Sequence, residues 1–237
     1  MFFDRGYFGA TRHPVMCSIY ILAILLCYEA GVTYCQHGDD LPWRTGLDAG
    51  WRYQLRQSSM PWLEWVPCGS LVVALSIWSL LRYKDMPREW LATLSGMVLE
   101  SFLLALPLLV AARAVGLLVG SSMSSMLADS SRWAGILGSL GAGVYEEIVF
   151  RLMLVPVLLA VSRLLGLRRV LQVVLALVLA GVLFALAHHI PPFREPFRQE
   201  LFIFRTVAGT YFGLVYRFRG IGIAVGAHTC YDLLATT

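Results

Sequence analysis

Long apolar blocks dominate this chain and limit what it can fold into. Seven candidate spans of mostly apolar residues follow one another, and short segments between them carry many of the charges. A helix of about 20 such residues crosses the hydrocarbon core of a bilayer. Only 14% of the residues are charged, against about 25% in an ordinary soluble domain, which excludes a soluble globule and a disordered chain. The spans are 15–35, 62–81, 91–112, 134–162, 170–189, 201–216 and 220–236.

This pattern predicts an all-α fold, a polytopic membrane bundle of about seven or eight transmembrane helices around a polar intramembrane cavity. The eighth helix would come from residues 114–128, a stretch rich in Gly, Ser and Met that we expect to be interfacial or re-entrant. Residues 36–61 are expected to form one long polar loop, because Asp and Pro interrupt them. Within one integral membrane domain, we separate N-terminal transmembrane helices (1–133) from a C-terminal helical core (134–237).

The distribution of basic residues bears on location and partners. A net charge of +4 does not indicate a nucleic-acid partner, because the arginines lie in loops at the level of the lipid headgroups. Loop arginines are more numerous on the side of the N-terminus, which predicts that this terminus is cytoplasmic. The first span is too long for the apolar core of a signal peptide and is expected to be an uncleaved anchor. The compact size, without a separate soluble domain, suits a bacterial inner (cytoplasmic) membrane protein.

Several ionisable side chains fall inside the expected spans. A charge at bilayer depth costs several kcal/mol, so such a group is a functional candidate. There are more of them than a simple membrane anchor needs, and most lie in the C-terminal core. They are Glu29, Glu100, Glu146, Glu147, Arg151, His188, Arg205, His228 and Asp232.

The densest group is Glu146-Glu147-x-x-x-Arg151. Glu147 and Arg151 are four residues apart, with the acid on the N-terminal side, and are expected to pair on one helix face. Neighbouring residues on a helix point in different directions, so Glu146 has no partner in its own helix. It could face a cavity and act as a general base. A buried ion network between two helices is the structural alternative, but it does not explain the second glutamate.

Glycines at close-packing spacings flank these polar residues and let a second helix approach. The pairs Gly209/Gly213 and Gly222/Gly226 are expected to draw the last two spans together. A further run precedes the glutamates: Gly135, Gly138, Gly141 and Gly143.

Two histidines complete the set of candidates. His188 lies near the end of the fifth span, and His228 and Asp232 share a face of the last one. A carboxylate that accepts from one ring nitrogen fixes the tautomer and frees the other nitrogen. Taken singly, His188 could be a hydrogen-bonded core residue and His228–Asp232 a satisfied buried pair. Taken together with Glu146, they could line one polar cavity.

The catalytic motifs that the chain lacks exclude several reaction mechanisms. The chain has no H-E-x-x-H or G-x-S-x-G motif, its five cysteines form no C-x-x-C pair, and Cys230 has no context of a nucleophile. A glutamate that activates water remains, with imidazoles to orient that water and stabilise an oxyanion. This is peptide-bond hydrolysis without a covalent intermediate. The non-catalytic alternatives are a membrane scaffold, an immunity protein or a proton-coupled carrier.

Three motifs in order resemble those of the CPBP family (CAAX protease and bacteriocin-processing, also called Abi), which includes type II CAAX prenyl endopeptidases. They are Glu146-Glu147-x-x-x-Arg151, Phe184-x-x-x-His188 and His228-x-x-x-Asp232. The resemblance implies a hydrolase, an intramembrane protease of glutamate or metallo type, that acts on a membrane-anchored protein or peptide. It also implies site roles: Glu146 as the base, His188 holding the water, His228 and Asp232 at the oxyanion, and Glu147 and Arg151 as structural support.

Two features of the resemblance leave alternatives. Many family members have Asn where this chain has Asp232, and an ionised carboxylate cannot donate to an oxyanion. Asp232 must therefore be protonated, orient His228, or act on a metal. Glu146, His188 and His228 could hold zinc, but their spacing matches no compact zinc signature, so we favour a site without metal or other cofactor, with zinc as the alternative.

The substrate class depends on the side to which the cavity opens. With seven spans and a cytoplasmic N-terminus, the cavity is expected to open towards the outer face. This favours protein sorting, the removal of a C-terminal sorting signal from exported proteins. The alternative is an activity like that of a CAAX protease on a lipidated tail, which would arrive from the cytosol.

Overall fold

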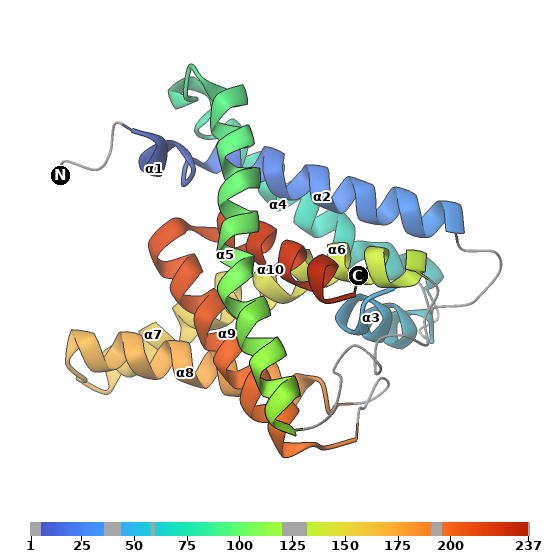
Figure 1. The fold of residues 1–237 in the computed structure, drawn as a ribbon. Coiled ribbons are helices and arrows are strands. Elements are labelled where there is room, and N and C mark those ends of the chain that lie inside the picture. The colour runs from blue at the N-terminus through green and yellow to red at the C-terminus, as the bar shows by residue number, and fades with distance from the viewer. Residues whose placement is uncertain (1–5, 36–43, 58–59, 120–131, 191–195, 237) are drawn as a thin grey trace.

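A computed structural model of the protein describes residues 6–35, 44–57, 60–119, 132–190 and 196–236. Every regular element in these ranges is a helix, which confirms the all-α fold (Figure 1). The helices are α1 (Tyr7–Ala10), α2 (Pro14–Cys35), α3 (Gly46–Arg56), η1 (Pro61–Trp65), α4 (Val66–Leu80), η2 (Tyr83–Asp85), α5 (Trp90–Val119), α6 (Arg132–Glu147), a π-helix (Ile148–Leu154), α7 (Val155–Leu164), α8 (Arg169–Ala187), α9 (Gln199–Arg219) and α10 (Ile221–Thr236).

Within the described ranges, four segments are long and apolar enough to cross a membrane: Pro14–Cys35, Trp62–Leu80, Trp90–Val115 and Arg169–Ala187. They fit an integral membrane protein. Two of the other expected spans are interrupted or short, since the π-helix separates α6 from α7 and α10 has only 16 residues. The count of seven or eight spans and the polar cavity therefore stay predictions.

The segment expected to be one polar loop, 36–61, contains helix α3. That part of the prediction is wrong, because Asp48 and Arg52 form an ion pair one turn apart and both are buried. Residues 36–43 and 58–59 lie outside the described part of the chain. The same holds for most of the expected helix at 114–128, whose first residues belong to the end of α5.

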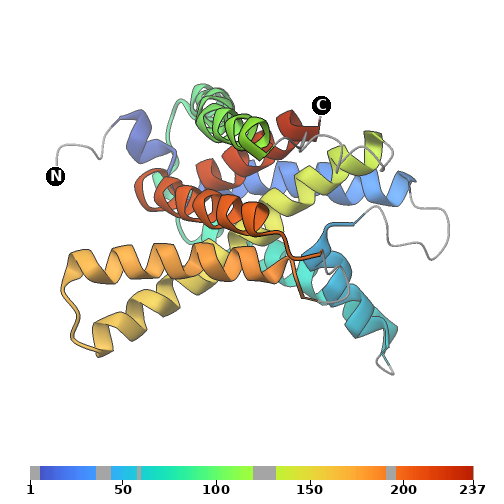
Figure 2. The ribbon, with the colours of Figure 1, turned by 60° about the horizontal axis from the view of Figure 1, so that its bottom comes forward.

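Helix α10 lies at the centre of the bundle, and every residue from Ile221 to Thr229 is buried. It contacts α5 and α6 along most of its length, and α2 and α9 more briefly. Helices α7 and α8 lie side by side and extend to one side of the bundle, with α9 beside α8 (Figure 1, Figure 2). The residues that carry the three motifs are therefore on adjoining helices.

Glycines set the close approaches, though not all those that the sequence predicts. A Cβ at Gly143 would overlap Thr229 of α10, so the small-residue run of α6 does admit a second helix. In α9, Gly209 lies against Gly181 of α8. In α10, Gly222 lies against Cys17 of α2 and Met97 of α5. The pair Gly209/Gly213 thus brings α9 to α8, and the pair Gly222/Gly226 brings α10 to α2 and α5. The expectation that these glycines join α9 to α10 is wrong.

Candidate active site

Three helix segments bring the motif residues together. Glu146 and Glu147 end α6, His228 and Asp232 lie on α10, and His188 follows the last residue of α8. Gly143 makes this possible, because its missing side chain lets α10 approach α6 one turn before the glutamates.

Glu147 lies at the centre of the group and is fully buried. Its Oε1 is 2.8 Å from Nη1 of Arg151, the pair that their spacing predicts. The same oxygen is 2.7 Å from Nδ1 of His228, which donates to it. The sequence did not predict this second contact, because nothing in the chain indicates which face of α10 turns towards α6.

Arg151 links the π-helix to α9. Its Nη2 donates to the backbone carbonyl of Gly209 at 3.1 Å. Its guanidinium lies over the rings of Phe184, 4.8 Å from the centroid, and Phe212, 5.7 Å from the centroid. A buried cation with a carboxylate, a carbonyl and two aromatic faces around it joins three segments of the chain.

Glu146 is the less engaged of the two acids. Glu146 is 8% exposed, whereas Glu147 is fully buried. Its Oε2 lies 3.8 Å from Nε2 of His228, and within the described ranges no hydrogen bond engages its carboxylate. Glu146 is thus free to bind a small polar molecule such as water.

The imidazole of His228 has carboxylates at both ring nitrogens. Nδ1 faces Glu147, while Nε2 is 3.4 Å from Oδ2 of Asp232 and also faces Glu146. The expectation that Asp232 engages one nitrogen and leaves the other free is therefore wrong. Because Nε2 lies between two carboxylates, a proton must be present either on Nε2 or on one of the two acids. The protons are shared among His228 and its neighbouring carboxylates and cannot be assigned to one residue.

Two aromatic rings fix the orientation of the His228 imidazole. The ring of Phe212 on α9 is stacked on it, with centroids 4.6 Å apart and 14° between the planes. The ring of Phe184 meets it edge-on at 5.9 Å. Phe212 was missed by sequence reasoning, and its only signal there is its place beside Gly213.

His188 also contacts Phe184. Its Nδ1 is 2.9 Å from the carbonyl oxygen of Phe184, and its ring is 4.9 Å from the Phe184 ring. In the described part of the chain, no hydrogen bond or ion pair joins His188 to Glu146 or His228. Phe184 therefore contacts both imidazoles, and His188 belongs to the same neighbourhood without touching the acids.

The π-helix at Ile148–Leu154 follows the two glutamates directly. Such wider turns occur often at functional sites. Here the turn carries Arg151 and still leaves it one turn from Glu147. No residue in this segment predicts the irregularity.

The candidate site offers few ligands for a metal ion. Among the described residues, no three His, Cys, Asp or Glu side chains are placed to hold one ion. Glu146, His188 and His228 thus do not form a three-ligand zinc set in this structure, because His188 is turned to the Phe184 carbonyl. The preference for a site without metal stays a prediction.

Comparison with known proteins agrees with the motifs. Residues 128–234 match the family model described as type II CAAX prenyl endopeptidase Rce1-like. No curated protein and no solved structure matches the chain. The matched range includes every residue of the candidate site, from Glu146 to Asp232. Residues 128–234 are therefore similar to the Rce1-like family of type II CAAX prenyl endopeptidases.

Proposed function

We propose that this protein is an endopeptidase that hydrolyses a peptide bond of a membrane-associated protein, with a water molecule activated by Glu146. One observation carries the proposal. The carboxylate of Glu146 lies beside His228 without a hydrogen bond from the described residues, while Glu147 is held by Arg151 and His228. The two adjacent acids thus have different roles, one as support and one as base.

The reaction follows from these positions. Glu146 removes a proton from water as the water oxygen attacks the carbonyl carbon of the substrate. The carbonyl electrons move to its oxygen, and the Nε2–H of a doubly protonated His228 stabilises the oxyanion. As the C–N bond breaks, the leaving amine takes the proton from Glu146. The products are a carboxylic acid and an amine, and no covalent enzyme intermediate forms.

The remaining residues assist these two. His188 would hold the water, with Nδ1 fixed by the Phe184 carbonyl so that its other nitrogen is available. Asp232, 3.4 Å from Nε2 of His228, would orient the imidazole before the reaction and share its Nε2–H with the oxyanion as that forms. Glu147 and Arg151 would keep α6, α9 and α10 in register. In this mechanism no step needs a metal ion.

For the substrate, we propose a C-terminal sorting signal on exported proteins, supported by the excess of loop arginines on the N-terminal side. The family description favours a second candidate, a prenylated CAAX tail. The two differ in the side from which the substrate enters.

A comparison of membrane proteins from cells with the wild-type protein and with Glu146→Gln tests the function. We expect at least one membrane-associated protein to be shortened only with the wild type. Mass spectrometry of its new C-terminus would then identify the bond that is cut. Identical protein ends in both membranes would contradict a protease and favour a scaffold or carrier.

A further inference from the structure

A second cluster of buried charges lies outside the family-matched residues. The carboxylate of Glu29 on α2 accepts from Arg44 at 3.2 Å and from Arg52 at 3.0 Å. Asp48 on α3 accepts from the same two arginines, at 2.7 and 2.9 Å. Two acids and two bases therefore form a closed, neutral group that holds α3 against α2.

This cluster reaches the catalytic helix through tyrosines. The hydroxyl of Tyr145, the residue before Glu146, donates to Oε1 of Glu29 at 3.1 Å. Tyr28 meets the ring of Tyr145 edge-on at 5.9 Å and donates to Asp48 at 2.8 Å. The Tyr145 hydroxyl and the Tyr28–Tyr145 ring contact thus add a polar and an aromatic link to the packing of α2 and α3 against α6.

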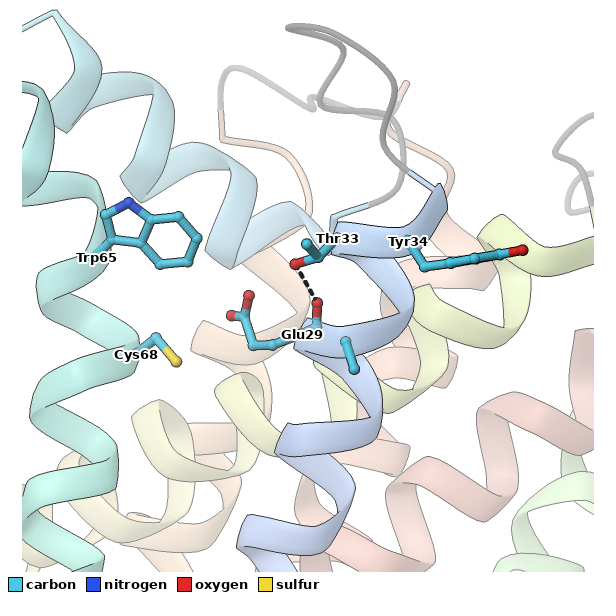
Figure 3. A pocket seen from close by; sticks show the side chains of 6 residues that line it. Glu29, Thr33, Tyr34, Trp65 and Cys68 are labelled. Atoms are coloured by element: carbon cyan, nitrogen blue, oxygen red, sulfur yellow. Dashed lines mark hydrogen bonds between the residues drawn. The ribbon is translucent and has the colours of Figure 1, made fainter.

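The Glu29 carboxylate lies beside an open cavity. A cavity of about 650 Å³ lies beside it, and Figure 3 shows its carboxylate between α2 and the side chains of Trp65 and Cys68. The guanidinium of Arg52 lies over the Trp65 ring, 4.6 Å from the centroid. Tyr145 itself is packed in the hydrophobic core, whereas the Glu29 carboxylate borders this open space, so hydrogen bonds and ion pairs fix the carboxylate on that side.

We propose that Tyr145 and Glu29 are positioning residues for the two glutamates. A helix turns by about 100° per residue, so a residue anchored at position 145 determines where the next two side chains point. The bond from Tyr145 to Glu29 sets the rotation of α6 at which Glu146 and Glu147 face His228. The N-terminal half thereby contributes to the geometry of the family domain. This inference rests on the proposed function for its catalytic readout.

The decisive variant is Tyr145→Phe, which removes the hydroxyl and keeps the ring against Tyr28. We expect kcat on the identified substrate to fall about tenfold with KM within about twofold, because small displacements of catalytic groups lower rates strongly. Glu29→Gln should act in the same direction. The matched controls are Tyr53→Phe and Glu64→Gln in α3 and η1, which should keep the wild-type kcat.

A second readout does not require proteolysis. In protein labelled with ¹⁵N-histidine, the Nδ1 signal of His228 is identified by its loss in His228→Gln. We expect this signal to shift in Tyr145→Phe and to stay in place in Tyr53→Phe, with melting temperatures that show both variants to be folded.

The kcat and the His228 Nδ1 signal together distinguish a failure of the proposed function from a failure of the positioning role. If the wild type cuts no protein but the His228 signal still responds to Tyr145→Phe, the proposed function fails and the positioning contact stands. If Tyr145→Phe leaves both the kcat of an active protease and the His228 signal unchanged, the positioning role is overturned. Should Glu29→Gln not fold, Tyr145→Phe alone decides.

Discussion

The carboxylate of Glu147 and the imidazole of His228, 81 residues apart in the chain, are joined at 2.7 Å in a fully buried contact. The same oxygen of Glu147 is paired with Arg151. Glu147 therefore couples the family's first motif to its third, and leaves the neighbouring Glu146 as the acid available to water. This division of roles leads to the predictions below.

Glu146→Gln should remove most of the catalytic activity without loss of the fold. The change is isosteric and breaks no hydrogen bond among the described residues, but it removes the base. General-base catalysis contributes about 10²–10⁴-fold, so we expect kcat to fall by that amount and the melting temperature to stay close to that of the wild type. Full activity of purified Glu146→Gln protein would eliminate this mechanism. The control is Glu89→Gln, an exposed acid between η2 and α5.

Glu147→Gln and Arg151→Ala should cost stability as well as activity. Each leaves a buried charged group without its partner, a loss of about 3–5 kcal/mol in comparable cases. Thermal unfolding in detergent measures the effect, with Glu89→Gln and the exposed Arg163→Ala as controls. Wild-type melting of both variants would show that the buried pair does not hold the helices together.

Asp232 offers a test of its role as an orienting group. Asparagine at this position can still accept a hydrogen bond from Nε2 of His228 through its side-chain carbonyl. We expect Asp232→Asn to keep activity within about tenfold and Asp232→Ala to lose more than that, because orientation by one group is typically worth about 10–100-fold. Equal loss in both variants would mean that the negative charge itself is needed.

The sequence predicted the contacts within a helix better than those between helices. The pairs Glu147–Arg151 and His228–Asp232 follow from the four-residue spacing of a helix, and both are present. The contact of Glu147 with His228 depends on how α6 and α10 face each other, which local spacing does not determine. The π-helix was not predictable either, because no residue in Ile148–Leu154 indicates a wider turn.

The N-terminal half shows the same limit. The sequence predicts that Asp48 and the arginines near it lie in a loop, because polar residues and prolines between apolar spans usually mark a loop. In the structure they neutralise one another around Glu29, and that pairing stabilises helix α3. Glu29 was recognised as a candidate from its depth in a span, but its partners were not.

Metal content should distinguish the two catalytic types. If Glu146 alone activates water, purified active protein should contain far less than one zinc ion per chain, and chelators should leave its activity unchanged. Elemental analysis and activity after dialysis against chelator measure both quantities. Stoichiometric zinc that is lost together with activity, and restored with it, would reverse the preference for a site without metal.

Access to the site should be from the outer face if the N-terminus is cytoplasmic. In a variant without the native cysteines, we place single cysteines in the segments 163–169 and 191–200. An impermeant thiol reagent on intact cells should label 191–200 and spare 163–169 until the membrane is opened. Outer access then supports exported proteins as substrates, because a CAAX tail is presented from the cytosol. The reverse labelling pattern would invert the orientation and make the prenylated tail the better substrate, while leaving the roles of Glu146 and His228 unchanged.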